Sequence, residues 1–240
     1  MKMTLLQIVQ SILSDMDSEE VNSISDSVEA TDIASIVRDT FYNITSTRNI
    51  PEHEELIKLT ALSDTNYPTH FQYPTNTKQI FKVWYTNRDG IYKEIRFLEP
   101  LDFLTNTDGI QTNYVSVSDK NAGTTLRIKN DRDPSYYTSF DDKYLVFDSY
   151  DADIESSLQE SKVRAYGSKV PVFNITDNFV PDLDIDMFPY LLAESKSVAM
   201  SLKKGAVDPK VEQHARRQKS YVQNRRYNTK RSPKWKAYGR

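Results

Sequence analysis

The 240-residue sequence contains no cysteine. This absence excludes disulfide bonds, thiolate nucleophiles and every zinc site that requires sulfur ligands. The three histidines, His53, His70 and His214, are far apart in the chain, so we expect no imidazole metal site either. Glycine is scarce, with six residues, and neither common spacing of a phosphate-binding loop occurs. We therefore expect no bound metal and no cofactor.

Long hydrophobic runs are also missing, since none approaches the roughly 20 residues that span a bilayer. The N-terminal stretch MKMTLLQIVQSILSDM intersperses apolar with polar residues, and no small-residue cleavage site follows it. We interpret it as an amphipathic helix and not as a signal peptide. The expectation is a protein made in the cytoplasm, with no membrane partner.

Charge is distributed unevenly along the chain. Thirteen basic and two acidic residues lie between Lys203 and Arg240, which gives this region a net charge of +11. The remaining sequence holds 18 basic and 32 acidic residues, a net charge of −14. A basic tail on an acidic body favours binding to an anionic partner, which could be nucleic acid, another protein or a second copy of the chain.

Helical periodicity marks both ends of the sequence. Thr4 is the expected cap of a first helix ending near Met16, and Asp26 with Glu29 has the spacing of a capping box for a second helix through Ile44. Near the C-terminus, Asp184 or Asp186 is expected to cap a helix that ends before Gly205. Asp208 and Pro209 then begin a last helix that continues to about Tyr227.

The central part of the sequence has the alternation and turn residues of β-strands. Gln79–Thr86 and Tyr92–Leu98 flank an Asp-Gly turn, which predicts a hairpin. Pro100–Leu104 predicts a short helical turn. Further strands are expected in four segments: 113–118, 124–130, 143–149 and 162–166. Because the connections are short, we expect antiparallel pairing.

These patterns predict an α+β fold. In it, the N- and C-terminal helices form one antiparallel bundle, an antiparallel β region is inserted between them, and an extended C-terminal arm follows. The expected boundaries are 1–54 for the N-terminal helices, 55–178 for the β domain, 179–226 for the C-terminal helices and 227–240 for the basic arm.

The candidate catalytic groups are pairs of carboxylates. An acid/base pair needs surroundings that separate the two pKa values, and the sequence does not show such surroundings. The runs at 141–142, 151–153 and 182–186 contain closely spaced aspartates. Asp182, Asp184 and Asp186 have the early spacing of a calcium loop, but the glycine and the closing glutamate of that loop are missing. His53 lies among glutamates, where we expect it to be solvated. The sequence predicts that the protein is not an enzyme.

The basic tail interleaves arginine and lysine with aromatic residues. Arg, Tyr and Trp anchor protein interfaces, while basic and aromatic side chains together also suit nucleic acid, and a solvated tail is the third reading. Two aromatic rings in the last six residues argue against the third reading. The candidate partner-docking residues are Arg216, Arg217, Tyr221, Arg225, Arg226, Tyr227, Lys230, Arg231, Lys234, Trp235 and Tyr238.

Three segments carry a resemblance to a known family. They are the N-terminal LLQIVQSILSDM with SISDSVEATDIASIVRDTFYNITSTRNI after it, the PTHFQYP start of the strand-rich middle, and MFPYLLAESKSVAMSLKKGAVDPKVEQHARRQKSYVQN. In pattern and order the chain resembles the head-to-tail adaptor proteins of short-tailed bacteriophages (podoviruses), also called tail tubular protein A. The resemblance covers nearly the whole chain, although no single motif is diagnostic. The tail here is more basic than expected for that family.

The resemblance implies a structural virion protein of the tail and neck region. It implies a homo-oligomeric ring of twelve copies that docks under the portal protein, extends the DNA channel and connects it to the tail nozzle protein during DNA ejection. DNA would pass through without sequence-specific binding. Whether the arm contacts portal, a neighbouring subunit or DNA stays open. A DNA-binding accessory or regulatory protein is the alternative, and a small enzyme with an unrecognised site is the third.

Overall fold

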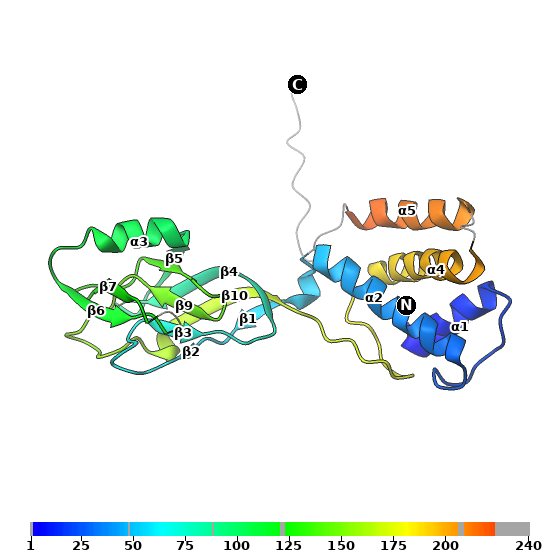
Figure 1. Cartoon of the computed structure of the whole chain (residues 1–240), viewed down its shortest axis with the longest axis horizontal. Helices are drawn as coiled ribbons and strands as arrows, with labels where there is room; N and C mark the ends of the chain where they lie inside the picture. Colours follow the sequence, from blue (N-terminus) through cyan, green and yellow to red (C-terminus); the bar gives the residue numbers. More distant parts are fainter. Residues whose placement is uncertain (1, 48, 88, 121–122, 206–208, 224–240) are drawn as a thin grey trace, which may run out of the picture. The chain divides into compact units, whose positions relative to one another are not determined.

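The computed structural model describes residues 2–47, 49–87, 89–120, 123–205 and 209–223. The chain forms two compact units (Figure 1). We call residues 1–53 and 171–240 the helical unit and residues 54–170 the β unit. The chain therefore leaves the helical unit once, builds the β unit, and returns.

The helical unit is arranged around α4 (Phe188–Lys204), which packs against α1, α2 and α5. The other elements of this unit are α1 (Leu5–Asp15), α2 (Val28–Thr47), α5 (Pro209–Gln223) and two short 3₁₀ turns, η1 (Pro51–His53) and η3 (Ile185–Met187). Gly205 follows α4 in the left-handed region, at φ 65°, as expected for a glycine that ends a helix.

The first helix begins as predicted and the second does not. Thr4 and Gln7 form a reciprocal capping box at the start of α1. At the start of α2, the Ser27 hydroxyl accepts the hydrogen bond from the Ala30 N–H. The Asp26 carboxylate instead accepts hydrogen bonds from two backbone N–H groups earlier in the α1–α2 loop. The predicted cap by Asp26 is therefore wrong, because that carboxylate closes the preceding turn.

One continuous apolar core holds the helical unit together. Each large apolar side chain that is fully buried contributes about 1.5–3 kcal/mol, so the helices are stabilised mainly by this shared core. Phe41 of α2 lies at its centre, 5.1 Å from the ring of Phe173, and Phe173 packs 4.7 Å from Phe179. The core thus includes the segment 171–187, which returns from the β unit.

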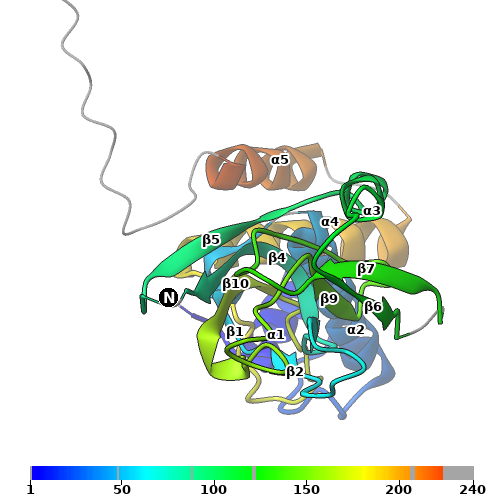
Figure 2. The same cartoon turned by 90° about the vertical axis from the view of Figure 1, so that its left-hand side faces the viewer.

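The β unit contains an eight-stranded sheet in the order β1-β10-β4-β5-β8-β9-β3-β2, which curls around its own core (Figure 2). Its strands are β1 (Glu54–Ile57), β2 (Thr60–Ala61), β3 (His70–Gln72), β4 (Thr77–Thr86), β5 (Tyr92–Phe97), β8 (Tyr136–Thr138), β9 (Tyr144–Phe147) and β10 (Val163–Lys169). A separate hairpin joins β6 (Tyr114–Ser118) to β7 (Thr125–Lys129). α3 (Pro100–Asp108) packs on β7 and β8, and η2 (Glu160–Lys162) precedes β10.

The predicted fold organisation is wrong. The chain mixes helices and strands, but its largest element is the curled eight-stranded sheet, and the described residues contain five α-helices. The sheet is also not purely antiparallel, because β5 and β8 pair in parallel through Arg96 with Tyr136 and Phe97 with Tyr137. Long amphipathic helices give a strong periodic signal, whereas strands of two to four residues give almost none, so the sequence understated the size of the sheet.

Several individual strands were predicted correctly. β4 and β5 form the expected hairpin, and strands occur in all four of the further predicted segments. β3 and β8 were missed, and α3 is longer than the short turn expected at Pro100. The predicted extended arm, 227–240, lies outside the described residues.

Candidate docking surfaces

The outer face of α5 carries the described part of the predicted docking set. α5 buries Ala215 and Val222, while Arg216 and Arg217 are exposed and Tyr221 is 56% exposed. Arg216 pairs with Glu212 one turn earlier, a contact that contributes only a few tenths of a kcal/mol on a solvated helix face. The exposed side of α5 is therefore basic and aromatic.

The remaining predicted docking residues lie outside the described part of the chain. These are Arg225, Arg226, Tyr227, Lys230, Arg231, Lys234, Trp235 and Tyr238. The structure therefore brings Arg216, Arg217 and Tyr221 together on one helix.

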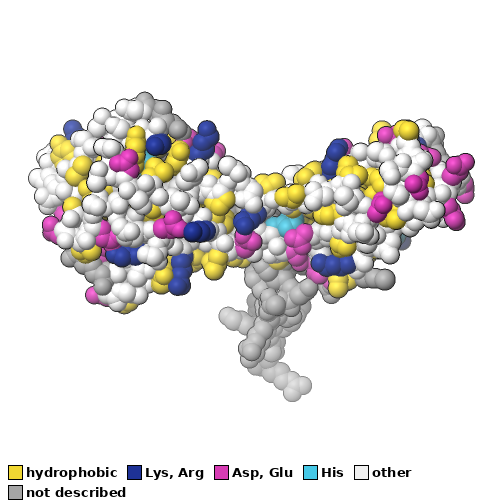
Figure 3. Space-filling view, turned by 90° about the horizontal axis from the view of Figure 1, so that it is seen from below, with side chains coloured by type: hydrophobic (Ala, Val, Ile, Leu, Met, Phe, Trp, Pro, Cys, Tyr) yellow, Lys and Arg dark blue, Asp and Glu magenta, His cyan; other side chains and the backbone are white. Residues whose placement is uncertain are grey.

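The α1–α2 end of the helical unit has the opposite charge. Residues 3–29 contain six carboxylates and no lysine or arginine: Asp15, Asp17, Glu19, Glu20, Asp26 and Glu29. Figure 3 shows acidic side chains gathered at this end, at the right of the view. Lys196 of α4 pairs with Asp15, and Glu29 accepts a hydrogen bond from Ser18. Glu19 and Glu20 are exposed.

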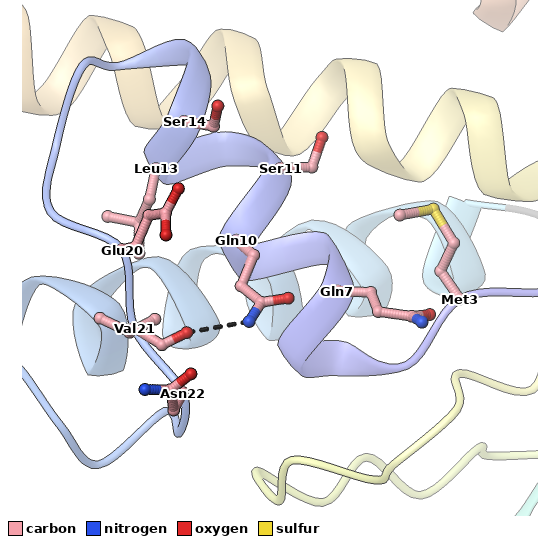
Figure 4. A pocket seen from close by; sticks show the side chains of 9 residues that line it. All are labelled: Met3, Gln7, Gln10, Ser11, Leu13, Ser14, Glu20, Val21 and Asn22. Carbon is pink, nitrogen blue, oxygen red and sulfur yellow. Dashed lines mark hydrogen bonds between the residues drawn. The ribbon is translucent and has the colours of Figure 1, made fainter.

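A groove of about 670 Å³ lies between α1 and the loop that follows it (Figure 4). One wall is a row of uncharged polar side chains on α1: Gln7, Gln10, Ser11 and Ser14. The opposite wall is Glu20, Val21 and Asn22, and Met3 and Leu13 complete the lining. The Gln10 side-chain amide donates to the Val21 carbonyl, 2.8 Å away, and so fixes the loop against the helix.

This groove was missed by the sequence reasoning, although part of its signal was present. Gln7, Gln10, Ser11 and Ser14 recur at helical spacing on the side of α1 opposite its apolar stripe. That spacing predicts a polar face. It cannot predict that the loop folds back over this face, because the loop is held by Asp177, more than 150 residues later.

One aspartate of each run considered for catalysis caps a local turn. The carboxylate of Asp141 accepts the N–H groups of Lys143 and Tyr144, and that of Asp151 accepts the N–H of Asp153. Asp184 likewise caps η3 through the Ile185 N–H. Among the described residues, no group of three or more His, Asp or Glu side chains is placed to hold a metal ion.

His53 is not solvated, which corrects the sequence-based expectation. It is only 7% exposed, its Nε2 lies 2.8 Å from the carbonyl oxygen of Asp182, and its ring packs edge-on to Phe41. His53 therefore ties η1 to the returning segment and has a structural role.

His70 is the most unusual titratable group of the β unit. It is 1% exposed, and neither ring nitrogen has a hydrogen-bond partner. Burial lowers the pKa of His70 from 6.5 to about 4, so the ring is neutral near pH 7. The hydroxyl of Thr69, the preceding residue, is also buried without a partner. A substrate could not reach a group enclosed in this way, so this cluster does not form an open active site.

Comparisons with known proteins do not assign the chain to a family. No protein-family model matches the sequence, and a search of curated proteins found no match. Within the described ranges, no helix combines the length and hydrophobicity needed to cross a bilayer.

Proposed function

We propose that this chain is a structural subunit of the neck of a short-tailed bacteriophage, the head-to-tail adaptor. In this proposal, twelve copies close into a ring under the portal protein, extend the DNA channel and connect it to the tail nozzle protein. The chain has no catalytic role, and DNA passes through the ring without sequence-specific binding. The protein resides in the virion after synthesis in the host cytoplasm.

The observation that carries the proposal is the pair of oppositely charged surfaces on the helical unit. A closed ring requires heterologous contacts, in which one surface of a subunit meets a different surface of the next. The exposed basic face of α5 and the acidic α1–α2 end are two such surfaces on one compact unit. The family resemblance of the sequence supplies the portal, the nozzle and the number of copies.

The described acidic and histidine side chains favour a structural role. One aspartate of each run caps a turn, and His53 and His70 are buried in the two cores. Catalysis needs groups with perturbed environments in an accessible cleft. In the parts of the chain that the structure covers, the strongly perturbed histidine is enclosed, and one aspartate of each cluster bonds to backbone.

Binding to purified portal rings and to duplex DNA, measured side by side, tests the proposal. The full chain is expected to co-sediment with portal rings. The Arg216→Gln, Arg217→Gln double variant is expected to co-sediment less with them, because the exposed face of α5 contributes to the contacts between copies that close the ring on the portal. The Lys93→Gln, Lys143→Gln variant removes the same charge from exposed positions of the β unit and is the control.

The outcome also separates the adaptor from a DNA-binding accessory protein. Non-specific DNA binding weakens steeply with salt, in proportion to the number of phosphates neutralised. A chain that ignores portal rings but binds duplex DNA tightly, with a steep salt dependence, would replace the adaptor proposal with the DNA-binding one.

A further inference from the structure

The acidic end of the helical unit and the C-terminal region match in length and have opposite charge. Residues 3–29 carry six acidic and no basic side chains. Residues 213–240 carry ten basic and no acidic side chains. Such complementary surfaces attract each other over about 8 Å at physiological ionic strength, and they set which surfaces pair more than how tightly.

On one copy, the described end of the C-terminal region lies away from the acidic end of the helical unit. α5 runs antiparallel to α4 and ends at Gln223, at the opposite end of the helical unit from the α1–α2 loop (Figure 1). Its 15 residues span about 22 Å at 1.5 Å per residue. The C-terminal segment therefore begins at one end of the unit and its acidic complement lies at the other, which is the arrangement that head-to-tail contacts between copies require.

The α1 groove has the chemistry to hold an extended segment. The hydroxyls of Ser11 and Ser14 can each donate to or accept from a peptide main chain. Met3 is half-buried in the lining, and its flexible thioether suits contact with an aromatic ring. A volume of about 670 Å³ lies within the range of roughly 300–1,000 Å³ found for ligand sites, so it holds a few side chains and not a whole domain.

We propose that the α1 groove of one copy receives the basic segment 224–240 of a neighbouring copy. In that contact, the aromatic rings of Trp235 and Tyr238 fill the apolar part of the groove, and the basic side chains pair with Glu19 and Glu20 at its rim. This inference rests on the proposed ring assembly, and it assigns the arm to the neighbouring subunit instead of the portal or DNA.

Because the chain lacks cysteine, engineered cysteines test this contact directly. One full-length chain carries Ser14→Cys in the groove and a second carries Ser232→Cys in the basic segment. The two are mixed under mild oxidation, free and after assembly with portal rings, and the covalent heterodimer is measured on non-reducing gels. The control pairs Ser232→Cys with Asn106→Cys, an exposed position on α3.

The proposal predicts several-fold more heterodimer with Ser14→Cys than with Asn106→Cys in assembled rings. Equal yields would overturn it. A chain carrying both Ser14→Cys and Ser232→Cys that cross-links only within itself, at every protein concentration, would also overturn it. Rings that form normally without the Ser14 cross-link would disprove this contact and leave the adaptor function standing, whereas failure to form rings at all would count against the function.

Charge reversal at the rim of the groove tests whether ion pairs help to hold the basic segment there. Glu19→Lys with Glu20→Lys is expected to lower the Ser14–Ser232 cross-link yield roughly tenfold, by replacing attractive pairs with repulsive ones. Glu52→Lys with Asp108→Lys, both exposed and outside the groove, should leave the yield unchanged. Compensating Lys230→Glu and Arg231→Glu on the partner should restore it, and an unchanged yield in the Glu19, Glu20 variant would contradict the pairing.

Discussion

The carboxylate of Asp177 accepts a hydrogen bond from the backbone N–H of Ile24, which lies 2.8 Å away and 153 residues earlier in the chain. The same carboxylate accepts a hydrogen bond from the Ser23 hydroxyl, which lies 2.9 Å away. The backbone carbonyl of Asp177 accepts another from the N–H of Leu6, at the start of α1. One residue of the returning segment therefore fixes both the first helix and the loop that forms the far wall of the groove.

Replacing Asp177 with alanine should destabilise the helical unit. Hydrogen bonds to a charged acceptor contribute about 1.5–3 kcal/mol each when buried, and this site is partly solvated, so we expect a loss of about 1–3 kcal/mol. Denaturant unfolding measures the change, and hydrogen exchange at Ile24 should accelerate. Asn178→Ala at the exposed neighbouring position is the control. Equal stability of the two variants would show that Asp177 does not hold the loop.

His70 should make the stability of the β unit depend on pH. Burial lowers its folded-state pKa to about 4, whereas the unfolded chain takes up a proton near pH 6.5. Between these values the unfolded state binds more protons, so stability falls as pH decreases from 7 towards 4, by up to roughly 3 kcal/mol. The charged groups that act on the ring are Asp119, Asp141 and Lys120.

The His70→Leu variant isolates this contribution, because other titrating groups, including the buried Asp148, cancel in the difference from the parent chain. The stability difference between parent and variant should change with pH between 6.5 and 4 and be constant above pH 7.5. NMR titration of the His70 ring in the folded chain should give a pKa well below 6. A ring that titrates near 6.5 would refute the burial argument.

Gly167 of β10 is expected to tolerate no side chain. A Cβ at this position would lie 2.3 Å from the carbonyl oxygen of Gln79 and 2.6 Å from Cδ1 of Ile57, beside a register shift between β10 and β4. Gly167→Ala should cost about 1–3 kcal/mol through overpacking. At Gly109 a Cβ would meet its nearest atom at 3.7 Å, and φ is −69°. Gly109→Ala should therefore be neutral or slightly stabilising, and a similar loss for both variants would contradict the packing.

Local patterns in the sequence were sufficient to predict the long helices and strands. Thr4 and Gln7 sit three residues apart ahead of an apolar stripe, which specifies α1 without any distant contact. β8 shows the opposite situation, since two of its three residues pair in parallel with β5, forty positions earlier. The burial of His53 likewise depends on Asp182, 129 residues away. A structural feature that depends on residues so far apart leaves no local pattern in a single sequence, so it could not be predicted from one.

The same distinction holds for the docking surfaces. The basic face of α5 could be predicted, because the charge run and the helical spacing are both local. The row of polar side chains on α1 could also have been predicted from its helical spacing. The groove could not have been predicted, because it exists only where Gln10 and Asp177 hold the loop at Glu20–Asn22 against that row.

Light scattering of the full chain, alone and mixed with portal rings from the same source, tests the central claim most directly. The account predicts that addition of portal rings produces a complex whose mass exceeds that of the ring by twelve subunits. A chain whose mass and elution are unchanged by portal rings at any ratio would contradict the adaptor function.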